Sequence, residues 1–290
     1  MTPLAPFFLL FSAVCIASDE TPELAGTPEG AQREAVFLSR GRQMTFEGRR
    51  SGEGYFDASG RSMVFQSERY DGNPFFQIFL MNRDTGKTEL VSPGKGRTTC
   101  AWIHPEGDRV LFASTHDDPL AEEAQKLTLQ ERNSGREPRY SWNYDRTYEI
   151  YEWDKATQGY RNLTNAEGYD AEGSYSPDGR LIAFASNRSA YETKLSAEDQ
   201  KKFEQDQAWA NEIYIMNVDG SNLRRLTNSP GYDGGPFFSP DGQRICFRRF
   251  TEDGLTAEIM TMKIDGTDEK RITKIGAMSW APYYLSLIHI

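Results

Sequence analysis

Apolar and polar residues alternate in four short stretches of the chain, each directly after a tight turn that ends in glycine. The turns are Asp57–Gly60, His104–Gly107, Ser176–Gly179 and Ser239–Gly242. The third residue after each turn glycine is Met63, Val110, Ile182 or Ile245, and the fifth is Phe65, Phe112, Phe184 or Phe247. A period of two is what a strand needs to bury one face. Because proline, aspartate and glycine supply the geometry of hairpin turns, each stretch is predicted to be the second strand of a hairpin.

Two further strands recur after each of these hairpins. The first covers residues 77–82, 149–154, 212–217 and 258–263, and the second is short and ends at Ser92, Thr164, Thr227 or Thr273. Another glycine stands 11 or 12 residues before each turn glycine, and the stretch between the two supplies one more strand. The repeating unit is therefore predicted to be a four-stranded antiparallel meander.

The spacing of the units predicts how they assemble. Successive turn glycines are 47, 72 and 63 residues apart. A period of about 40 to 50 residues with four strands per unit is typical of a β-propeller blade. A lone meander exposes two edges and one apolar face, and radial packing of the units covers both. We therefore predict an all-β propeller; a β-sandwich is the alternative, and the regularity of the repeat argues against it.

The repeat also resembles a known family. Ser-Pro-Asp-Gly followed by Ile-x-Phe, then Glu-Ile-Tyr-x-Met-Asn-x-Asp-Gly and Arg-Leu-Thr, is similar to the WD-like propeller repeat of the TolB family. The resemblance covers residues 42–284 and is closest at 168–242. It implies a propeller, usually six-bladed, that serves as an exported protein-interaction module or as the N-terminal half of a hydrolase.

The two ends of this repeat region predict an incomplete ring. Residues 41–45 resemble the outermost strand of a blade, and residues 275–284 resemble the start of a fifth unit. Leu285–Ile290 resembles the translation of a transposon mosaic-end adapter. We therefore expect four full blades plus a partial closing blade over 41–284, a non-native tail over 285–290, and a natural protein that continues beyond Tyr284.

The N-terminus predicts export. Leu4–Ile16 is an apolar run of 13 residues, too short to span a bilayer comfortably, and small residues follow it. We predict a signal peptide over residues 1–18, cleaved after Ala17, then a linker over 19–40, and a periplasmic or secreted location. Lipidation of Cys15 and a buried N-terminal helix are the alternatives.

Charge, cysteine content and the absence of known catalytic motifs limit the classes of function that fit the chain. The net charge of −10 argues against nucleic acid as a partner. The cysteines at 15, 100 and 246 cannot form a disulfide framework, and Cys100 and Cys246 are expected to be buried, inert thiols. No nucleophile elbow, His-Glu-x-x-His, phosphate-cradling loop or Cys-x-x-Cys occurs, so no catalytic residue, metal or cofactor is predicted, although the chain can still be part of an enzyme.

Candidate binding residues gather around two insertions, at about 117–147 and 189–211, both between the second and third strands of a unit. Helices are predicted at 120–132 and 196–209, the second opened by a capping box of Ser196 and Asp199. The insertions open on the same face as the links at 168–170 and 231–233. The predicted binding face comprises Asp170, Asp233, Tyr169, Tyr232, His116, Asp117, Trp142 and Trp209. Tyr140, Tyr144 and Tyr191 lie near them, and all of these aromatics can equally pin loops to the rim.

Each polar candidate has two interpretations. His116-Asp117-Asp118 offers metal ligands, but a solvated acidic turn is favoured because adjacent residues cannot all face one ion. Asp170 and Asp233 occupy equivalent positions, which suggests a structural task, the bonding of backbone N–H groups within the loop; the alternative is a channel mouth where they bind a cation or a basic peptide group. His104 is predicted to be a turn residue.

These observations favour an exported propeller that binds a protein or peptide and is associated with the cell envelope. The alternative is a substrate-gating N-terminal propeller of a secreted peptidase, of prolyl-oligopeptidase or zinc aminopeptidase type, whose catalytic domain follows. A carbohydrate-binding propeller is a third possibility, and it requires that Trp142 and Trp209 be exposed.

Overall fold

The computed structural model describes residues 28–36, 41–135 and 142–285, so the predicted signal peptide, Tyr140 and nearly all of the predicted tail lie outside the described residues. The chain divides into two compact units, Met1–Glu47 and Gly48–Ile290. The described part of the first unit holds one helix, α1 (Pro28–Ala35), inside the predicted linker. Its first residue is proline, which suits the first turn of a helix.

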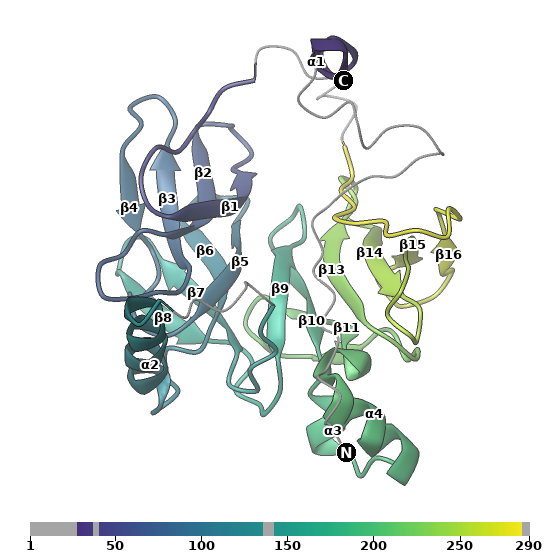
Figure 1. The fold of residues 1–290 in the computed structure, drawn as a ribbon. Helices are drawn as coiled ribbons and strands as arrows, with labels where there is room; N and C mark the ends of the chain where they lie inside the picture. The colour runs from purple at the N-terminus through teal and green to yellow at the C-terminus, as the bar shows by residue number, and fades with distance from the viewer. Residues whose placement is uncertain (1–27, 37–40, 136–141, 286–290) are drawn as a thin grey trace. The chain divides into compact units, whose positions relative to one another are not determined.

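The second unit contains four antiparallel sheets of four strands within its described residues (Figure 1). Blade 1 is β1 (Arg50–Phe56), β2 (Ser62–Glu68), β3 (Gln77–Asn82) and β4 (Thr88–Leu90), and blade 2 is β5 (Thr98–Ile103), β6 (Arg109–Ser114), β7 (Glu149–Asp154) and β8 (Gly159–Asn162). Blade 3 is β9 (Asp170–Tyr175), β10 (Leu181–Ser186), β11 (Glu212–Asn217) and β12 (Arg224–Arg225), and blade 4 is β13 (Asp233–Phe238), β14 (Arg244–Phe250), β15 (Ala257–Lys263) and β16 (Lys270–Arg271). Each sheet runs in chain order, which confirms the predicted meander.

Neighbouring blades share their hydrophobic cores. Leu111 and Ile150 of blade 2 pack with Tyr169 and Ile182 of blade 3. The next pair of blades is joined in the same way, by Ile213 of blade 3 and residues of blade 4 that include Phe247. Separate cores between successive sheets are the arrangement of a propeller and not of a sandwich with one shared interior, so the predicted fold class is confirmed.

The alternation along each second strand has a different meaning from the one predicted. Ile182 and Phe184 are buried as expected, but Ala183 and Ala185 between them are also fully buried. A blade has a neighbouring blade on each side, and therefore both faces of its strands are covered. The period of two separates the residues that face one neighbour from those that face the other.

The two insertions carry the helices. α2 (Ala121–Asn133) lies between β6 and β7, and α3 (Ser189–Glu192), α4 (Ala197–Gln205) and the 3₁₀ helix η1 (Gln207–Ala210) lie between β10 and β11. Ser196 Oγ accepts a hydrogen bond from the Asp199 N–H at 3.1 Å, as the capping box predicts. α4 ends before Trp209 because Asp206 begins a new turn, with its side chain accepting the Ala208 N–H at 2.9 Å. None of the helices described has the length and apolar character needed to cross a membrane.

Two expected strands are not formed. Residues 41–46 have no regular secondary structure, and residues 274–285 contain only an isolated parallel bridge between Ala257 and Met278. An isolated strand leaves its backbone groups unpaired. The four sheets described are each already complete with four strands, so they offer no three-stranded partner for residues 41–45.

Candidate functional site

The first strand of every blade carries a β-bulge at the same place. β1, β5, β9 and β13 contact one another around the axis, and each shifts register against its neighbour in mid-strand. The residue at each bulge has a left-handed backbone: Glu53 (φ 44°), Cys100 (φ 52°), Glu172 (φ 59°) and Gly235 (φ 61°). This conformation is unfavourable for a residue with a side chain, and a bulge re-aims the side chain that it carries.

Two of these bulge residues, from blades 1 and 2, are in contact. The Cys100 thiol donates a hydrogen bond to Glu53 Oε2 at 3.2 Å. Cys100 is buried, as predicted; burial raises the pKa of its thiol, and the nearby Glu53 carboxylate raises it further. Loss of hydration also raises the pKa of Glu53, and the negative charge of Glu172 adds to this effect.

The other two bulge positions are joined by an arginine from β14. Arg248 Nη2 donates to Glu172 Oε2 at 2.8 Å and to the Tyr232 hydroxyl at 2.6 Å, and that hydroxyl donates to Glu172. A Cβ at position 235 would lie 2.4 Å from Arg248 Nη1, so glycine is required for the arginine to enter. We refer to Glu53, Cys100, Glu172, Tyr232 and Arg248 as the channel cluster.

Aromatic side chains lie directly beyond the bulges, towards the hairpin turns. The ring of Trp102 lies 4.6 Å from that of Tyr55 and 5.2 Å from that of Phe237, measured between centroids, and Tyr55 and Phe237 are 5.7 Å apart. Tyr283 packs against Trp102 and Phe237 at 6.2 and 5.7 Å. These four rings form an aromatic floor across the axis, on the turn side of the channel cluster.

The predicted aspartates have the structural role expected of them, but their partners differ from those predicted. Asp170 and Asp233 are fully buried, and each binds an arginine of its own blade: Arg188 pairs with Asp170, and Arg249 donates to Asp233 at 2.8 and 2.7 Å. The prediction that they bond loop N–H groups is therefore wrong. Burial raises the pKa of Asp170 to about 6, although the Arg188 charge opposes this. Because both carboxylates already have internal cations, neither offers a free charge to a ligand.

Three predicted residues meet at the channel cluster. Trp142 Nε1 donates to the Tyr169 hydroxyl at 2.8 Å, and that hydroxyl lies 3.4 Å from Glu172 Oε1. Tyr169 and Tyr232 are buried, whereas Trp142, from the first insertion, is half-buried. Tyr144 lies between the two tyrosines, with its ring 4.9 Å from Tyr169 and 6.1 Å from Tyr232.

The remaining predicted residues lie elsewhere. His116 and Asp117 contact Tyr151 of β7: the rings of His116 and Tyr151 are 4.1 Å apart, and the Tyr151 hydroxyl donates to Asp117 Oδ2 at 2.8 Å. Burial lowers the pKa of His116, although Asp117 acts in the opposite direction. Trp209 is half-buried beneath Lys202, whose Nζ lies 5.3 Å from the ring. Neither Trp142 nor Trp209 is exposed in the way that carbohydrate stacking requires.

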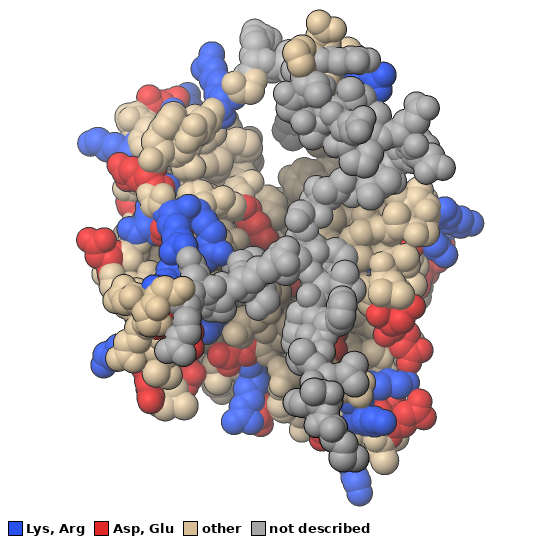
Figure 2. Space-filling view, viewed as in Figure 1, with Lys and Arg blue, Asp and Glu red and all other residues tan. Residues whose placement is uncertain are grey.

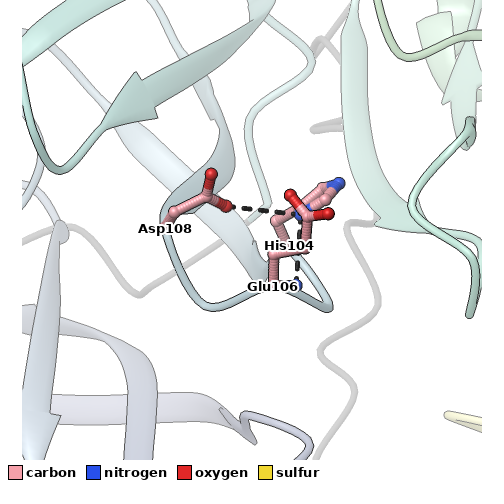
Figure 3. Close-up of side chains that lie close together, drawn as sticks. All are labelled: His104, Glu106 and Asp108. Atoms are coloured by element: carbon pink, nitrogen blue, oxygen red, sulfur yellow. Dashed lines mark hydrogen bonds and ion pairs between the residues drawn. The ribbon is translucent and has the colours of Figure 1, made fainter.

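His104 has a structural role beyond its turn. His104, Glu106 and Asp108 lie close together and form a group of possible metal ligands (Figure 3). However, His104 Nδ1 accepts the Glu106 N–H at 3.2 Å and Nε2 lies 3.2 Å from the Gly179 carbonyl oxygen. Arg109 Nη2 lies within 3.1 Å of both ring nitrogens, where a metal would need to approach. His104 therefore ties the turn of blade 2 to the turn of blade 3.

Sequence reasoning missed Glu53, Glu172 and Arg248. A signal for the first two was present, because Glu53, Cys100, Glu172 and Gly235 each stand seven residues before a turn glycine. No comparable signal marks Arg248. Over the visible surface both signs of charge are interspersed, so the acidic balance is not gathered into a patch there (Figure 2).

Comparison with known proteins gives partial matches. No family model matches the chain. It is 30% identical over 199 residues to the uncharacterized protein Atu1656 of Agrobacterium fabrum, covering 63% of this chain and 61% of that protein. It is 30% identical over 122 residues to the protein TolB homolog of Chlorobium chlorochromatii, covering 34% of this chain and 28% of that protein.

Two further matches are shorter or more distant. Over 99 residues the chain is 32% identical to the uncharacterized peptidase YuxL of Bacillus subtilis, covering 34% of this chain and 12% of that protein. The crystal structure of TolB from Acinetobacter baumannii matches with a TM-score of 0.53 and 20% identity, over 77% of this chain and 43% of that one. The chain thus spans less than two thirds of the length of these relatives.

Proposed function

We propose, on the premise that this chain is a TolB-like β-propeller, that it is an exported module which binds a protein or peptide at the insertion-bearing end of its channel. The observation that carries this proposal is the contact between Trp142 of the first insertion and Tyr169, which continues to Glu172. A loop excursion is thereby joined to polar groups on the propeller axis. Loops positioned by a rigid scaffold are a common place for binding residues.

The chemistry of this end suits a macromolecular partner. Tyrosine, tryptophan and arginine are the residues enriched at the centres of interfaces, and Trp142, Tyr144, Tyr232 and Arg248 lie within contact distance of one another or of shared neighbours. The net charge of −10 favours a basic or neutral partner over an acidic one.

Site-specific photo-crosslinking tests this proposal. A photoreactive residue at Asn143, which is exposed beside Trp142, is expected to give a discrete adduct with a partner in cells that export the protein. The matched position is Thr85, exposed in the turn between β3 and β4 of blade 1, where no adduct is expected. Equal adducts at both positions, or none at Asn143, would contradict a binding role for the insertion-bearing end.

A substrate-gating propeller of a secreted peptidase is the second candidate, and the match to a peptidase supports it. The complete gene product decides between the two. If it hydrolyses peptides and labels with a serine-hydrolase probe or loses activity on metal chelation, the propeller is part of an enzyme. If the complete product is inert towards peptides and still gives the Asn143 adduct, the binding module is supported.

A further inference from the structure

We propose that the channel cluster is a binding site for one cationic side chain, a lysine ammonium or an arginine guanidinium of a peptide, with Glu53 as the carboxylate that receives it. The inference rests on the proposed function, because it assumes a peptide or protein ligand. It adds the chemical class of the group that enters the channel and the residue that binds this group.

Glu53 is available to a ligand in a way that its neighbours are not. Glu53 is exposed to solvent, whereas Cys100 and Glu172 are 8% and 7% exposed. Its one hydrogen bond in the described structure comes from a thiol, which is a weak donor. Yet protein surrounds the carboxyl closely enough that lost hydration raises its pKa. A charged group that solvent reaches, but cannot fully hydrate, is a favourable position for an oppositely charged ligand.

Arg248 shows what kind of group the cluster accepts. Blade 4 has no side chain at its bulge position, Gly235, and the guanidinium of Arg248 occupies the space instead. This guanidinium bonds Glu172 at 2.8 Å, and its Cζ lies 4.2 Å from the ring centroid of Trp280 and 5.0 Å from that of Tyr232. A carboxylate combined with aromatic rings is a general arrangement for binding cations.

The surroundings of Glu53, contributed by blades 1 and 2, have similar components, but the cation that acts on its carboxyl, Arg248, is hydrogen-bonded to Glu172 instead. Glu53 supplies a carboxylate, and Tyr55 and Trp102, 4.6 Å apart, supply aromatic rings two residues beyond the bulges. When Glu53 and Glu172 are both ionised, Arg248 balances one of the two negative charges and leaves the other uncompensated. A second cation is therefore favoured in this region of low hydration.

The direction of entry follows from the aromatic floor. Tyr55, Trp102 and Phe237 meet across the axis on the side of the hairpin turns. With the turn side closed, we assign the entry of a ligand side chain to the opposite end, where the insertions lie. The cationic site and the photo-crosslinking position Asn143 thus test the same face of the propeller by independent means.

Peptide binding tests the proposal. The probes are capped pentapeptides Gly-Gly-Xaa-Gly-Gly with lysine, arginine or glutamine at Xaa, and binding is followed by NMR chemical-shift changes at low ionic strength. We expect the lysine and arginine peptides to bind at least about fivefold more tightly than the glutamine peptide, since a charge-assisted hydrogen bond is stronger than a neutral one. Glu53→Gln is expected to remove this preference. Glu123→Gln, the same charge change at an exposed position of α2, is expected to retain it.

A second variant separates binding from folding. Glu53→Gly removes the carboxylate and also relieves the left-handed backbone at that position, so it is expected to fold at least as stably as the parent protein. Loss of the cation preference in both variants, with thermal unfolding unchanged or improved in the glycine variant, supports the proposal. Equal binding of all three peptides to the parent protein, or an undiminished preference in Glu53→Gln, overturns it.

The two proposals fail in different ways. If the Asn143 adduct forms but the pentapeptides show no charge preference, the cationic site is wrong and the binding function stands. If no adduct forms and the preference is absent as well, both proposals are wrong. If the preference depends on Glu53 but no adduct forms at Asn143, the cationic site is supported and its assignment to a macromolecular partner is not.

Discussion

The turn glycines are similar in backbone but differ in what surrounds them. Gly179 and Gly242 both have φ of 69°, and both end a Ser-Pro-Asp-Gly turn. A Cβ at position 179 would lie 2.3 Å from His104 Nε2, whereas at position 242 the nearest atom, of Pro177, would be 3.7 Å away. The His104 ring also packs edge-on against Tyr175, with centroids 4.8 Å apart. A side chain at position 179 would therefore clash with the neighbouring blade, whereas one at position 242 would meet it at an ordinary contact distance.

This difference predicts unequal effects of the same substitution. Gly179→Ala and Gly242→Ala both introduce about 1–2 kcal/mol of backbone strain, and only the first adds a steric clash, of roughly 1–3 kcal/mol. We expect Gly179→Ala to be the more destabilising in urea unfolding. Combining it with His104→Ala should make its effect resemble that of Gly242→Ala. Equal destabilisation by the two single variants would show that His104 does not constrain the turn.

At the scale of elements, the same arrangement of side chains is found at the start of the third strand in blades 2, 3 and 4. Glu149, Glu212 and Glu258 accept hydrogen bonds from the hydroxyls of Thr164, Thr227 and Thr273 and from the N–H groups of Ala166, Ser229 and Gly276. In blade 1 Gln77 and Ser92 form the corresponding pair. Each arrangement fixes the start of the third strand to the segment that follows the fourth.

The contributions of Glu212 and Glu258 to the free energy of unfolding are predicted to change with pH in opposite directions. Burial and the Asp233 carboxylate raise the pKa of Glu212 to about 7, against hydrogen bonds from Thr227 and Arg225. Its stabilising contribution is therefore complete below the ordinary glutamate pKa of 4.5 and is lost as the pH rises through about 7. For Glu258 burial is outweighed by hydrogen bonds from Thr273, Arg271 and Gly276, which lower the pKa, so its contribution is lost as the pH falls.

Urea unfolding across this pH range provides the test. In the parent protein the free energy of unfolding should fall as the pH rises from about 4.5 to 7. In Glu212→Gln this fall should be smaller by roughly 1–3 kcal/mol. Glu258→Gln should instead reduce the loss of stability on acidification. A fall between pH 4.5 and 7 that is unchanged in Glu212→Gln would contradict the raised pKa.

The elements could be predicted because their signals are local. Turn residues and the alternation after each turn glycine depend on the backbone over a few residues, and the strands were found where these signals placed them. The ends of α4, the bulges and the Asp170–Arg188 pair depend on contacts between segments distant in the sequence. Tyr169, Tyr232 and Trp142, which the sequence placed on one face, lie close to Glu172, but the sequence could not show that Arg248, from a second strand, reaches Glu172 in the neighbouring blade.

At the scale of the whole molecule, apolar side chains are exposed at the last blade described. Leu255, Ile272 and Ile275 are 60%, 60% and 62% exposed, and Trp280 and Tyr283 nearby in the chain are 45% and 56% exposed. The residues that correspond to Ile272 are covered in blades 2 and 3, where Leu163 is 8% exposed and Leu226 packs against the core shared with blade 4. Exposed apolar groups of this kind favour association with other molecules.

We therefore expect the chain to self-associate as its concentration rises. The double variant Ile272→Ser with Ile275→Ser should lower the apparent mass in light scattering, while Leu127→Ser, at a 54% exposed position on α2, should not. The parent protein's thermal unfolding should be broad. A parent that remains monomeric at all concentrations and unfolds sharply would contradict this expectation.

The repeated bulge gives the propeller four equivalent positions on its axis that lie outside the hydrophobic cores between blades. Glutamate, cysteine, glutamate and glycine now occupy them in turn. A substitution at Glu53, Cys100 or Glu172 changes the charge or size presented on the axis, whereas one at Gly235 also displaces the Arg248 guanidinium. Ligand preference in such a scaffold can diverge one blade at a time, with the rest of the ring unaffected.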